Sequence, residues 1–230
     1  MAHSHRGRSL TKVGVIGSGQ IGPDIALYFS KVLHADGVQV VVVDIAEDAL
    51  AKGRARTEKK IRKGQETGAF KGDMADRMID SITFSSNYDD LKGAEMVVEA
   101  ATEDLGLKRK IFSQLEELCA DGAVLVSNSS HLEPEAIFAE AKDKSRCACV
   151  HYFFPAERNI VVEVIPGEGT DAATTDWLMS FYEAIGKAPV CVGSRYGYAV
   201  DPIFEGLFLA ALLIRDAGIG TSKEIDTVAR

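Results

Sequence analysis

The sequence predicts an α/β fold in which helices cover both faces of a mostly parallel sheet. Short apolar runs alternate with amphipathic stretches along most of the 230 residues, as in successive βαβ units. A glycine-rich loop joins the first apolar run to the first helical stretch, and an aspartate ends the next apolar run. These features are typical of a Rossmann-type doubly wound domain. We expect it to span residues 11–196, followed by the first helix of a truncated all-α domain over residues 197–230.

The composition narrows the class of protein. Hydrophobic residues make up 46% of the chain, which is enough for a sizeable core. The formal net charge of −8 argues against a nucleic-acid partner, because the phosphate backbone requires a basic surface. No apolar run approaches the roughly 18 residues that a membrane span needs, so no membrane partner is expected. Without a secretory signal, the four cysteines are interpreted as reduced thiols of a cytoplasmic protein.

The first ten residues are polar and irregular, and we expect them to form a disordered arm. Two histidines, His3 and His5, lie in this arm. A pair of histidines on a flexible terminus is a weak basis for a metal site, so no metal ion is expected.

The first half of the chain predicts strands joined by helices and one longer crossover. Val38–Asp44 has almost no polar interruption, which suits a strand covered on both faces. Glu47–Thr67 is a long charged helix, and Lys71–Ile79 returns from it, so a helical hairpin is expected after that strand. The other elements expected here are strands at Lys12–Ile16, Ile82–Phe84, Met96–Ala100 and Ala123–Asn128, and helices at Gly22–Ala35 and Leu107–Cys119.

The second half departs from this regular alternation. Asp201–Asp216 is apolar on nearly every side, so a partner must cover it. Thr221 and Glu224 form a capping box that opens a further helix just before Arg230, and we interpret the chain as a piece or first module of a longer protein. The other elements expected here are strands at Cys147–Phe154, Ile160–Ile165 and Val190–Val192, and helices at Glu133–Ala141 and Ala172–Ile185.

The glycine-rich loop is expected to bind a dinucleotide. Gly17 allows a tight turn, Gly19 lets the backbone approach a pyrophosphate, and Gly22 lets the helix and the strand pack closely. Free amides at the start of the helix then bind the phosphates. A carboxylate at Asp44 accepts hydrogen bonds from ribose hydroxyls and repels a 2′-phosphate, so NAD is favoured over NADP. The cofactor-binding residues expected from this motif are Gly17, Gly19, Gln20, Ile21, Gly22 and Asp44.

Further motifs extend over nearly the whole chain. They are Val97-Val98-Glu99-Ala100, Glu103–Lys108, Ser127-Asn128-Ser129-Ser130, His151, Val162-Glu163-Val164-Ile165 and Gly197–Val200. In these motifs and their spacing the sequence resembles the L-3-hydroxyacyl-CoA dehydrogenase family. The resemblance implies fatty-acid or related acyl-CoA oxidation, with hydride transfer from the 3-hydroxyl carbon to NAD. It also implies that Glu103 and Lys108 contact the nicotinamide-side ribose, and that the protein with a complete helical domain is a homodimer.

The residues themselves fit this chemistry. Oxidation of a secondary alcohol needs a base, and histidine suits this role because the ordinary pKa of imidazole lies near neutral pH. His151 is expected at the end of a strand, where open α/β sheets bind their ligands. If the following strand pairs with it, Glu163 can orient the imidazole. Ser130 can donate to the substrate oxygen, and Asn128 and Ser129 can reach the nicotinamide ribose. Without the family spacing, a core histidine, a solvent-facing strand glutamate and a helix N-cap would explain the same residues.

Four positions depart from the family pattern. The family has asparagine at the position of Phe154, asparagine and then arginine at Asp201 and Pro202, and serine at His131. Asp201 is still expected to contact the substrate, while adding charge near its carbonyl. His131 either replaces a lost polar contact or faces solvent. These departures keep open a dehydrogenase of a CoA-free hydroxy acid, such as a sugar acid, and a non-catalytic NAD-binding module of a larger protein.

A basic cluster lies on the expected helical hairpin, at Lys59, Lys60, Arg62 and Lys63. In the family the matching hairpin lies near the phosphates of the CoA nucleotide. The resemblance therefore implies that Lys59 and Lys63 contact an acyl-CoA substrate, where positive side chains would offset the negative net charge. The alternative is a solvated helix face.

Overall fold

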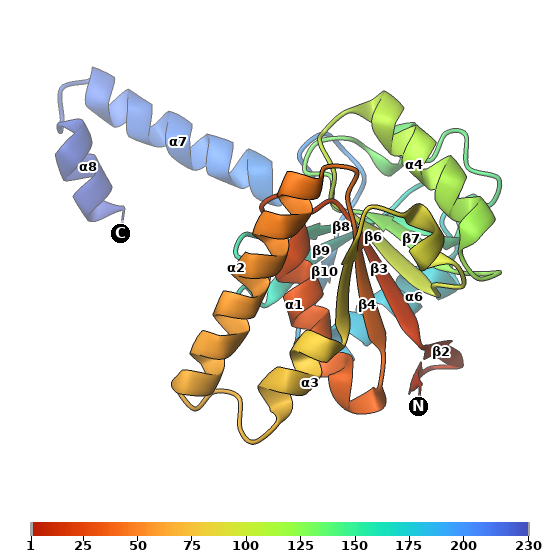
Figure 1. Cartoon of the computed structure of the whole chain (residues 1–230). Coiled ribbons are helices and arrows are strands. Elements are labelled where there is room, and N and C mark those ends of the chain that lie inside the picture. Colours follow the sequence, from red (N-terminus) through yellow and green to blue (C-terminus); the bar gives the residue numbers. More distant parts are fainter. Residues whose placement is uncertain (1, 230) are drawn as a thin grey trace.

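A single eight-stranded sheet forms the centre of the protein (Figure 1). The computed structural model describes residues 2–229. The strands from β5 to β8 are parallel, β9 runs antiparallel to β8, and β10 is parallel to β9. This arrangement confirms the predicted doubly wound fold. In spatial order the strands are β10 (Ala188–Cys191), β9 (Val161–Pro166), β8 (Cys147–Tyr152), β7 (Val124–Ser127), β6 (Met96–Glu99), β3 (Lys12–Ile16), β4 (Gln39–Val43) and β5 (Ile82–Ser85).

Helices cover both faces of this sheet. On one face, α1 (Gly22–Leu33) and α6 (Ala172–Ala184) bury Phe29 and Phe181 against strand valines. On the other face, α4 (Leu105–Leu118) and the short α5 (Pro134–Ile137) pack on the opposite side chains of the same strands. The central strands are therefore apolar on both sides, because neither side meets water.

A helical hairpin follows β4, as predicted. It consists of α2 (Glu47–Glu66) and α3 (Met74–Asp80). Ile61 of α2 and Met78 of α3 are fully buried and pack with Leu27 of α1 in a separate small core. The hairpin is thereby attached to the helix that begins at the glycine loop, which places α2 beside the expected cofactor site.

The prediction of a disordered arm is wrong for the residues that the structure describes. β1 (His3–His5) and β2 (Arg8–Leu10) form an antiparallel hairpin. The ring of His5 lies 2.9 Å from the Ser180 hydroxyl, and Trp177 donates to the His5 carbonyl at 3.1 Å. These partners lie on α6, about 170 residues away in the chain, so the local sequence does not reveal them. His3 contacts Asp36 at 2.7 Å, and both histidines are thus engaged within the protein.

Two helices follow the sheet domain and extend away from it (Figure 1). They are α7 (Val200–Asp216) and α8 (Ser222–Val228), and the predicted capping box of Thr221 and Glu224 opens α8. Large apolar side chains of α7 are exposed, among them Leu207 at 59% and Phe208 at 63%. Such a continuous apolar surface is typical of an interaction surface. Within residues 2–229, no helix combines the length and the apolar character needed to cross a bilayer.

A buried lysine anchors the loop between β8 and β9. The ammonium of Lys187 donates to the carbonyls of Ala156 at 2.6 Å and Asn159 at 2.5 Å, and it lies 3.8 Å from the ring centre of Tyr28. Burial lowers the pKa of Lys187 to about 8. The loop that follows His151 is therefore attached to the start of β10 and to α1 by one cation.

The stability contributed by Lys187 should depend on pH. An unfolded lysine has a pKa of about 10.4, so between pH 8 and that value only the unfolded chain holds the proton. The free energy of unfolding should therefore rise with pH in this range for the native protein, relative to Lys187→Met. Thermal or urea unfolding of both proteins at several pH values measures the difference. Lys110→Met, at an exposed position of α4, is the control. If the free energy of unfolding of the native protein fell above pH 8 relative to that of Lys187→Met, the lowered pKa of Lys187 would be contradicted.

Candidate active site

The glycine loop has the geometry that a phosphate-binding turn requires. Gly17 has a φ of +99°, in the region that favours glycine. A Cβ at Gly22 would lie 1.9 Å from the Gly17 carbonyl oxygen, whereas one at Gly19 would meet open space. The backbone amides of residues 19–22 make no hydrogen bond within the described part of the chain. Free amides at the start of α1 are therefore available to a pyrophosphate.

An arginine that the sequence analysis did not single out holds this loop. Arg56 on α2 donates to the carbonyls of Gly19 and Gln20, both at 2.7 Å. These two hydrogen bonds hold the carbonyl groups of the loop so that they point toward α2. Arg56 lies on an ordinary charged helix, so no feature of the sequence distinguishes it from its neighbours.

Asp44 stands where the ribose of a dinucleotide would be recognised. Its carboxylate accepts hydrogen bonds from the amides of Ser18 at 2.7 Å and Ala46 at 2.9 Å. A pocket opens beside it, at the carboxyl ends of β3, β4 and β6, where the strand order reverses. These residues fit NAD, since a 2′-phosphate would meet the negative carboxylate. The pocket is lined by Ile16, Gly17, Gly19, Val43, Asp44, Ile45, Tyr88, Ala100, Ala101, Thr102, Leu107 and Ile111.

A histidine and a glutamate pair across the antiparallel strands β8 and β9. His151 lies directly opposite Glu163 in the register, and its Nδ1 is 2.9 Å from Glu163 Oε2. Both side chains are buried. Because the Glu163 carboxylate accepts a hydrogen bond from Nδ1–H, Nε2 carries no proton and can accept one, and it lies 3.0 Å from the Ser130 hydroxyl. The structure thus brings the three predicted catalytic side chains into one line.

The second oxygen of Glu163 contacts a different element. Its Oε1 accepts the amides of Ala199 at 3.1 Å and Val200 at 3.0 Å, at the start of α7. No side chain within α7 caps this end of the helix. One carboxylate therefore orients the imidazole and caps the helix that leaves the sheet domain. The contact of Glu163 with His151 could be predicted from the sequence, whereas its contact with the start of α7 could not.

The expected ribose contacts are arranged around a buried ion pair. Lys108 is 1% exposed, and its ammonium lies 2.8 Å and 3.0 Å from the two oxygens of Glu99. It also lies 3.3 Å from Glu103, whose carboxylate accepts the Ser129 hydroxyl. Burial acts to raise the pKa of Glu103, but the Ser129 hydroxyl and the Lys108 charge outweigh it and lower that pKa. Lys108 thus neutralises Glu99 and holds Glu103 ionised. Asn128 accepts the Tyr152 amide at 2.8 Å.

Two of the positions that depart from the family pattern contact each other. His131 Nε2 lies 3.1 Å from Asp201 Oδ2, and the His131 ring packs on Tyr196 with the ring centres 5.1 Å apart. Of the two alternatives for His131, the structure favours a replaced polar contact. Phe154 is 60% exposed, and Pro202 lies in the first turn of α7, where its missing amide proton costs little.

The basic cluster on α2 divides into paired and unpaired side chains. Lys60 contacts Asp24 and Glu157, both at 2.7 Å, and Arg62 contacts Asp76 at 2.7 Å. Lys59 and Lys63 are exposed and form no ion pair within residues 2–229. Only these two therefore present uncompensated charge from the cluster.

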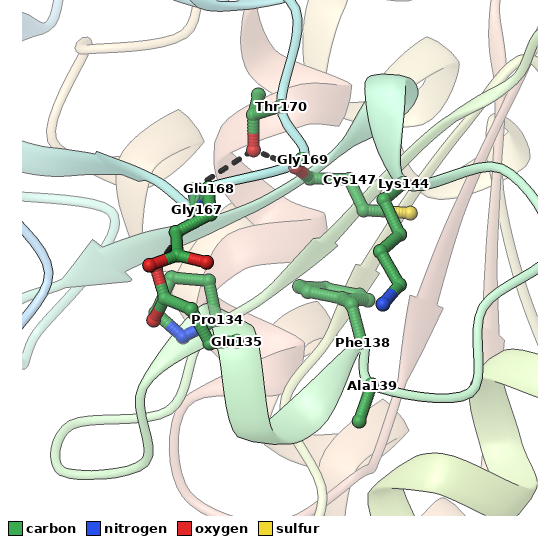
Figure 2. A pocket seen from close by; sticks show the side chains of 10 residues that line it. All are labelled: Pro134, Glu135, Phe138, Ala139, Lys144, Cys147, Gly167, Glu168, Gly169 and Thr170. Atoms are coloured by element: carbon green, nitrogen blue, oxygen red, sulfur yellow. Dashed lines mark hydrogen bonds between the residues drawn. The ribbon is translucent and has the colours of Figure 1, made fainter.

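A separate pocket lies at the opposite end of the sheet (Figure 2). It is lined by Cys147 at the start of β8, by Phe138 and Lys144, and by the loop after β9. Its polar groups already bond one another, since Thr170 donates to the Cys147 carbonyl at 2.5 Å and Glu135 accepts the Glu168 amide at 3.1 Å. His151 lies near the other end of β8, so this pocket is separate from the Ser130–His151–Glu163 line.

The glycine loop, Asp44 and the strand order define an NAD-binding Rossmann-type domain. A family model described as "3-hydroxyacyl-CoA dehydrogenase, NAD binding domain" matches residues 12–195. The chain therefore belongs to the 3-hydroxyacyl-CoA dehydrogenase family. This confirms the predicted family, the NAD cofactor and the class of enzyme, an NAD-dependent oxidoreductase.

Known relatives extend the similarity beyond the sheet domain. A 3-hydroxybutyryl-CoA dehydrogenase of Mycobacterium tuberculosis is 30% identical over 220 residues, which cover 95% of this chain and 76% of that protein. A 3-hydroxyadipyl-CoA dehydrogenase of Escherichia coli is 31% identical over 95% of this chain and 45% of its own length. Among solved structures, the (S)-3-hydroxybutyryl-CoA dehydrogenase PaaH1 from Ralstonia eutropha has a sequence 28% identical to this one. Its crystal structure matches with a TM-score of 0.86, over 94% of this chain and 75% of that chain.

Replacing Glu163 should affect catalysis and the start of α7 together. Glu163→Gln removes the negative charge that stabilises protonated His151, so kcat should fall by about 10²–10⁴-fold, as when other histidine-orienting carboxylates or bases are removed. Steady-state NADH formation measures this fall. Glu168→Gln, on the exposed loop after β9, is the matched control. A kcat for Glu163→Gln equal to that of the control would show that the carboxylate does not orient the base.

Proposed function

We propose that the protein oxidises the 3-hydroxyl group of an acyl-CoA thioester, with His151 as the general base. The line of hydrogen bonds from Ser130 through His151 to Glu163 carries this proposal. Bound NAD supplies the hydride acceptor. His151 lies near the carboxyl end of β8, and the glycine loop follows the carboxyl end of the parallel strand β3, so the base and the cofactor loop share one edge of the sheet.

Each of these side chains has a separate task in the proposed reaction. His151 would take the hydroxyl proton on Nε2 while the hydride leaves the carbon that bears the hydroxyl group for the nicotinamide of NAD. The O–H and C–H bonds break and a C=O bond forms, so the alcohol loses two electrons and two hydrogens. Glu163 holds the proton on Nδ1 and stabilises the imidazolium that forms. In the proposed complex the Ser130 hydroxyl, which contacts Nε2 in the structure, turns to donate to the substrate oxygen. Nε2 is then free to take the hydroxyl proton, and Ser130 holds the substrate oxygen near the base. The products are the 3-ketoacyl thioester, NADH and one proton.

A substitution at His151 tests the proposal. His151→Gln should lower the single-turnover rate of NADH formation by at least about 10²-fold, because no other described base contacts Ser130. The affinity for NAD should stay nearly unchanged. Stopped-flow detection of NADH and a binding titration with NAD measure the two quantities. His34→Gln, at the end of α1, is the control. Unchanged turnover in His151→Gln would refute the role of this histidine.

We further propose that the exposed lysines of α2 bind the CoA phosphates. Lys59 and Lys63 lie one helical turn apart and carry charge that no described acid neutralises. The neighbouring Lys60 and Arg62 are engaged in ion pairs, so they hold the hairpin in place. This division supports a phosphate contact for the first two residues.

Charge reversal at both lysines tests the CoA contact. Lys59→Glu with Lys63→Glu should raise the KM for an acyl-CoA roughly three- to tenfold at low salt, with kcat and the KM for NAD little changed. The KM for a CoA-free analogue should not move. Lys92→Glu with Lys110→Glu gives the same change in net charge elsewhere on the surface. Equal increases of KM for the two substrates would contradict the contact.

A CoA-free hydroxy acid is the second candidate substrate. Phe154, Asp201 and Pro202 alter the substrate side of the cleft. A solved diketoreductase, described as acting on dicarbonyl compounds, is 27% identical with a TM-score of 0.83 over 94% of this chain. A panel of hydroxyacyl-CoAs and free hydroxy acids distinguishes the two candidates by which compounds yield NADH. Binding of NAD without any turnover would instead support the non-catalytic module.

Two further expectations belong to the proposal. The apolar side chains exposed on α7 support a homodimer that forms when the helical domain is complete. The free thiols of all four cysteines are compatible with a reducing compartment such as the cytoplasm.

A further inference from the structure

A second histidine–carboxylate contact lies beside the proposed catalytic pair. His131 directly follows Ser130, which contacts His151. Asp201 directly follows Val200, whose amide binds Glu163. The 3.1 Å contact between His131 and Asp201 therefore connects the loop after β7 to the start of α7. The line of hydrogen bonds from Ser130 through His151 and Glu163 joins the same two segments. The His131–Asp201 pair is thus a second bridge between them.

The surroundings of this pair are rich in negative charge. The backbone amide of His131 donates to Glu103 Oε1 at 3.2 Å, and the Glu163 carboxylate caps the helix turn that carries Asp201. The side chains of the His131–Asp201 pair are partly exposed, at 41% for His131 and 26% for Asp201. An Asp201 carboxylate without a partner would add a further negative charge to these surroundings, and His131 supplies that partner.

We propose that His131 is a positioning residue, which pairs with Asp201 and so fixes Ser130 relative to α7. The inference rests on the proposed dehydrogenase function. Tyr196 packs on the His131 ring and so restricts it to this contact. Without His131, or without the Asp201 carboxylate, the Ser130 loop loses this attachment to α7.

This arrangement predicts that the effects of the two substitutions are not additive. His131→Gln and Asp201→Asn each break the same contact, so the double variant should lose little more activity than either single variant. Two independent defects would instead multiply in the double variant.

The kinetic test measures kcat and KM for the native protein, both single variants and the double variant. His131→Gln should lower kcat about tenfold, equivalent to ~1.4 kcal/mol of transition-state stabilisation, with the KM for NAD unchanged. In the Asp201→Asn background the same substitution should change kcat less than twofold. His34→Gln is the matched control at a distant histidine. A tenfold loss in both backgrounds, or none in either, would overturn the proposal.

A readout without turnover separates this inference from the proposed function. Hydrogen–deuterium exchange followed by mass spectrometry reports on the segments that contain Ser130 and Val200. Both single variants should exchange faster in both segments, and the double variant no faster than the singles. If the variants exchanged no faster than the native protein, the proposed His131–Asp201 bridge would be refuted, even in an inactive protein. If they exchanged faster but the native protein formed no NADH from any substrate, the bridge would be supported and the proposed dehydrogenase function refuted.

Discussion

The hydrogen bonds of the Glu163 carboxylate support both the proposed chemistry and the position of α7, the helix that leaves the sheet domain. One oxygen lies 2.9 Å from the His151 ring, and the other accepts two amides at the start of α7. A buried carboxylate needs such partners, because an unpaired one would be costly away from water. The antiparallel pairing of β8 and β9 supplies them, since it sets Glu163 opposite His151. The orientation of the base is thus linked to the position of the following helix.

The phosphate-binding part of the cofactor site is built from backbone amides, which charged side chains hold in place. The close approach of Gly22 to the Gly17 carbonyl lets α1 begin directly at the loop, and the free amides there attract phosphate. Arg56 and Asp44 fix the two ends of this loop region through backbone contacts. The parallel strands then bring the loop and the His151 strand to one edge of the sheet. A hydride donor and its acceptor can meet there without further rearrangement of the sheet.

The strands and main helices could be predicted because their apolar pattern is local. The pairing of His151 with Glu163 could be predicted from their spacing on adjacent strands. Contacts that depend on distant segments could not be: the N-terminal hairpin rests on α6, and Lys108 is enclosed by Glu99. The contact of His131 with Asp201 joins positions 70 residues apart, and neither side chain alone indicates it. Sequence patterns therefore located the site, while its electrostatics required the structure.

The central claim is that hydride leaves the hydroxyl-bearing carbon of an acyl-CoA for NAD while His151 takes the proton. Single-turnover formation of NADH from 3-hydroxybutyryl-CoA, with hydrogen or deuterium at C3, tests this most directly. The account predicts that NADH forms and that deuterium slows its appearance in the first turnover, because the C3–H bond breaks in the chemical step. Failure to form NADH from this or any longer acyl-CoA would contradict the account.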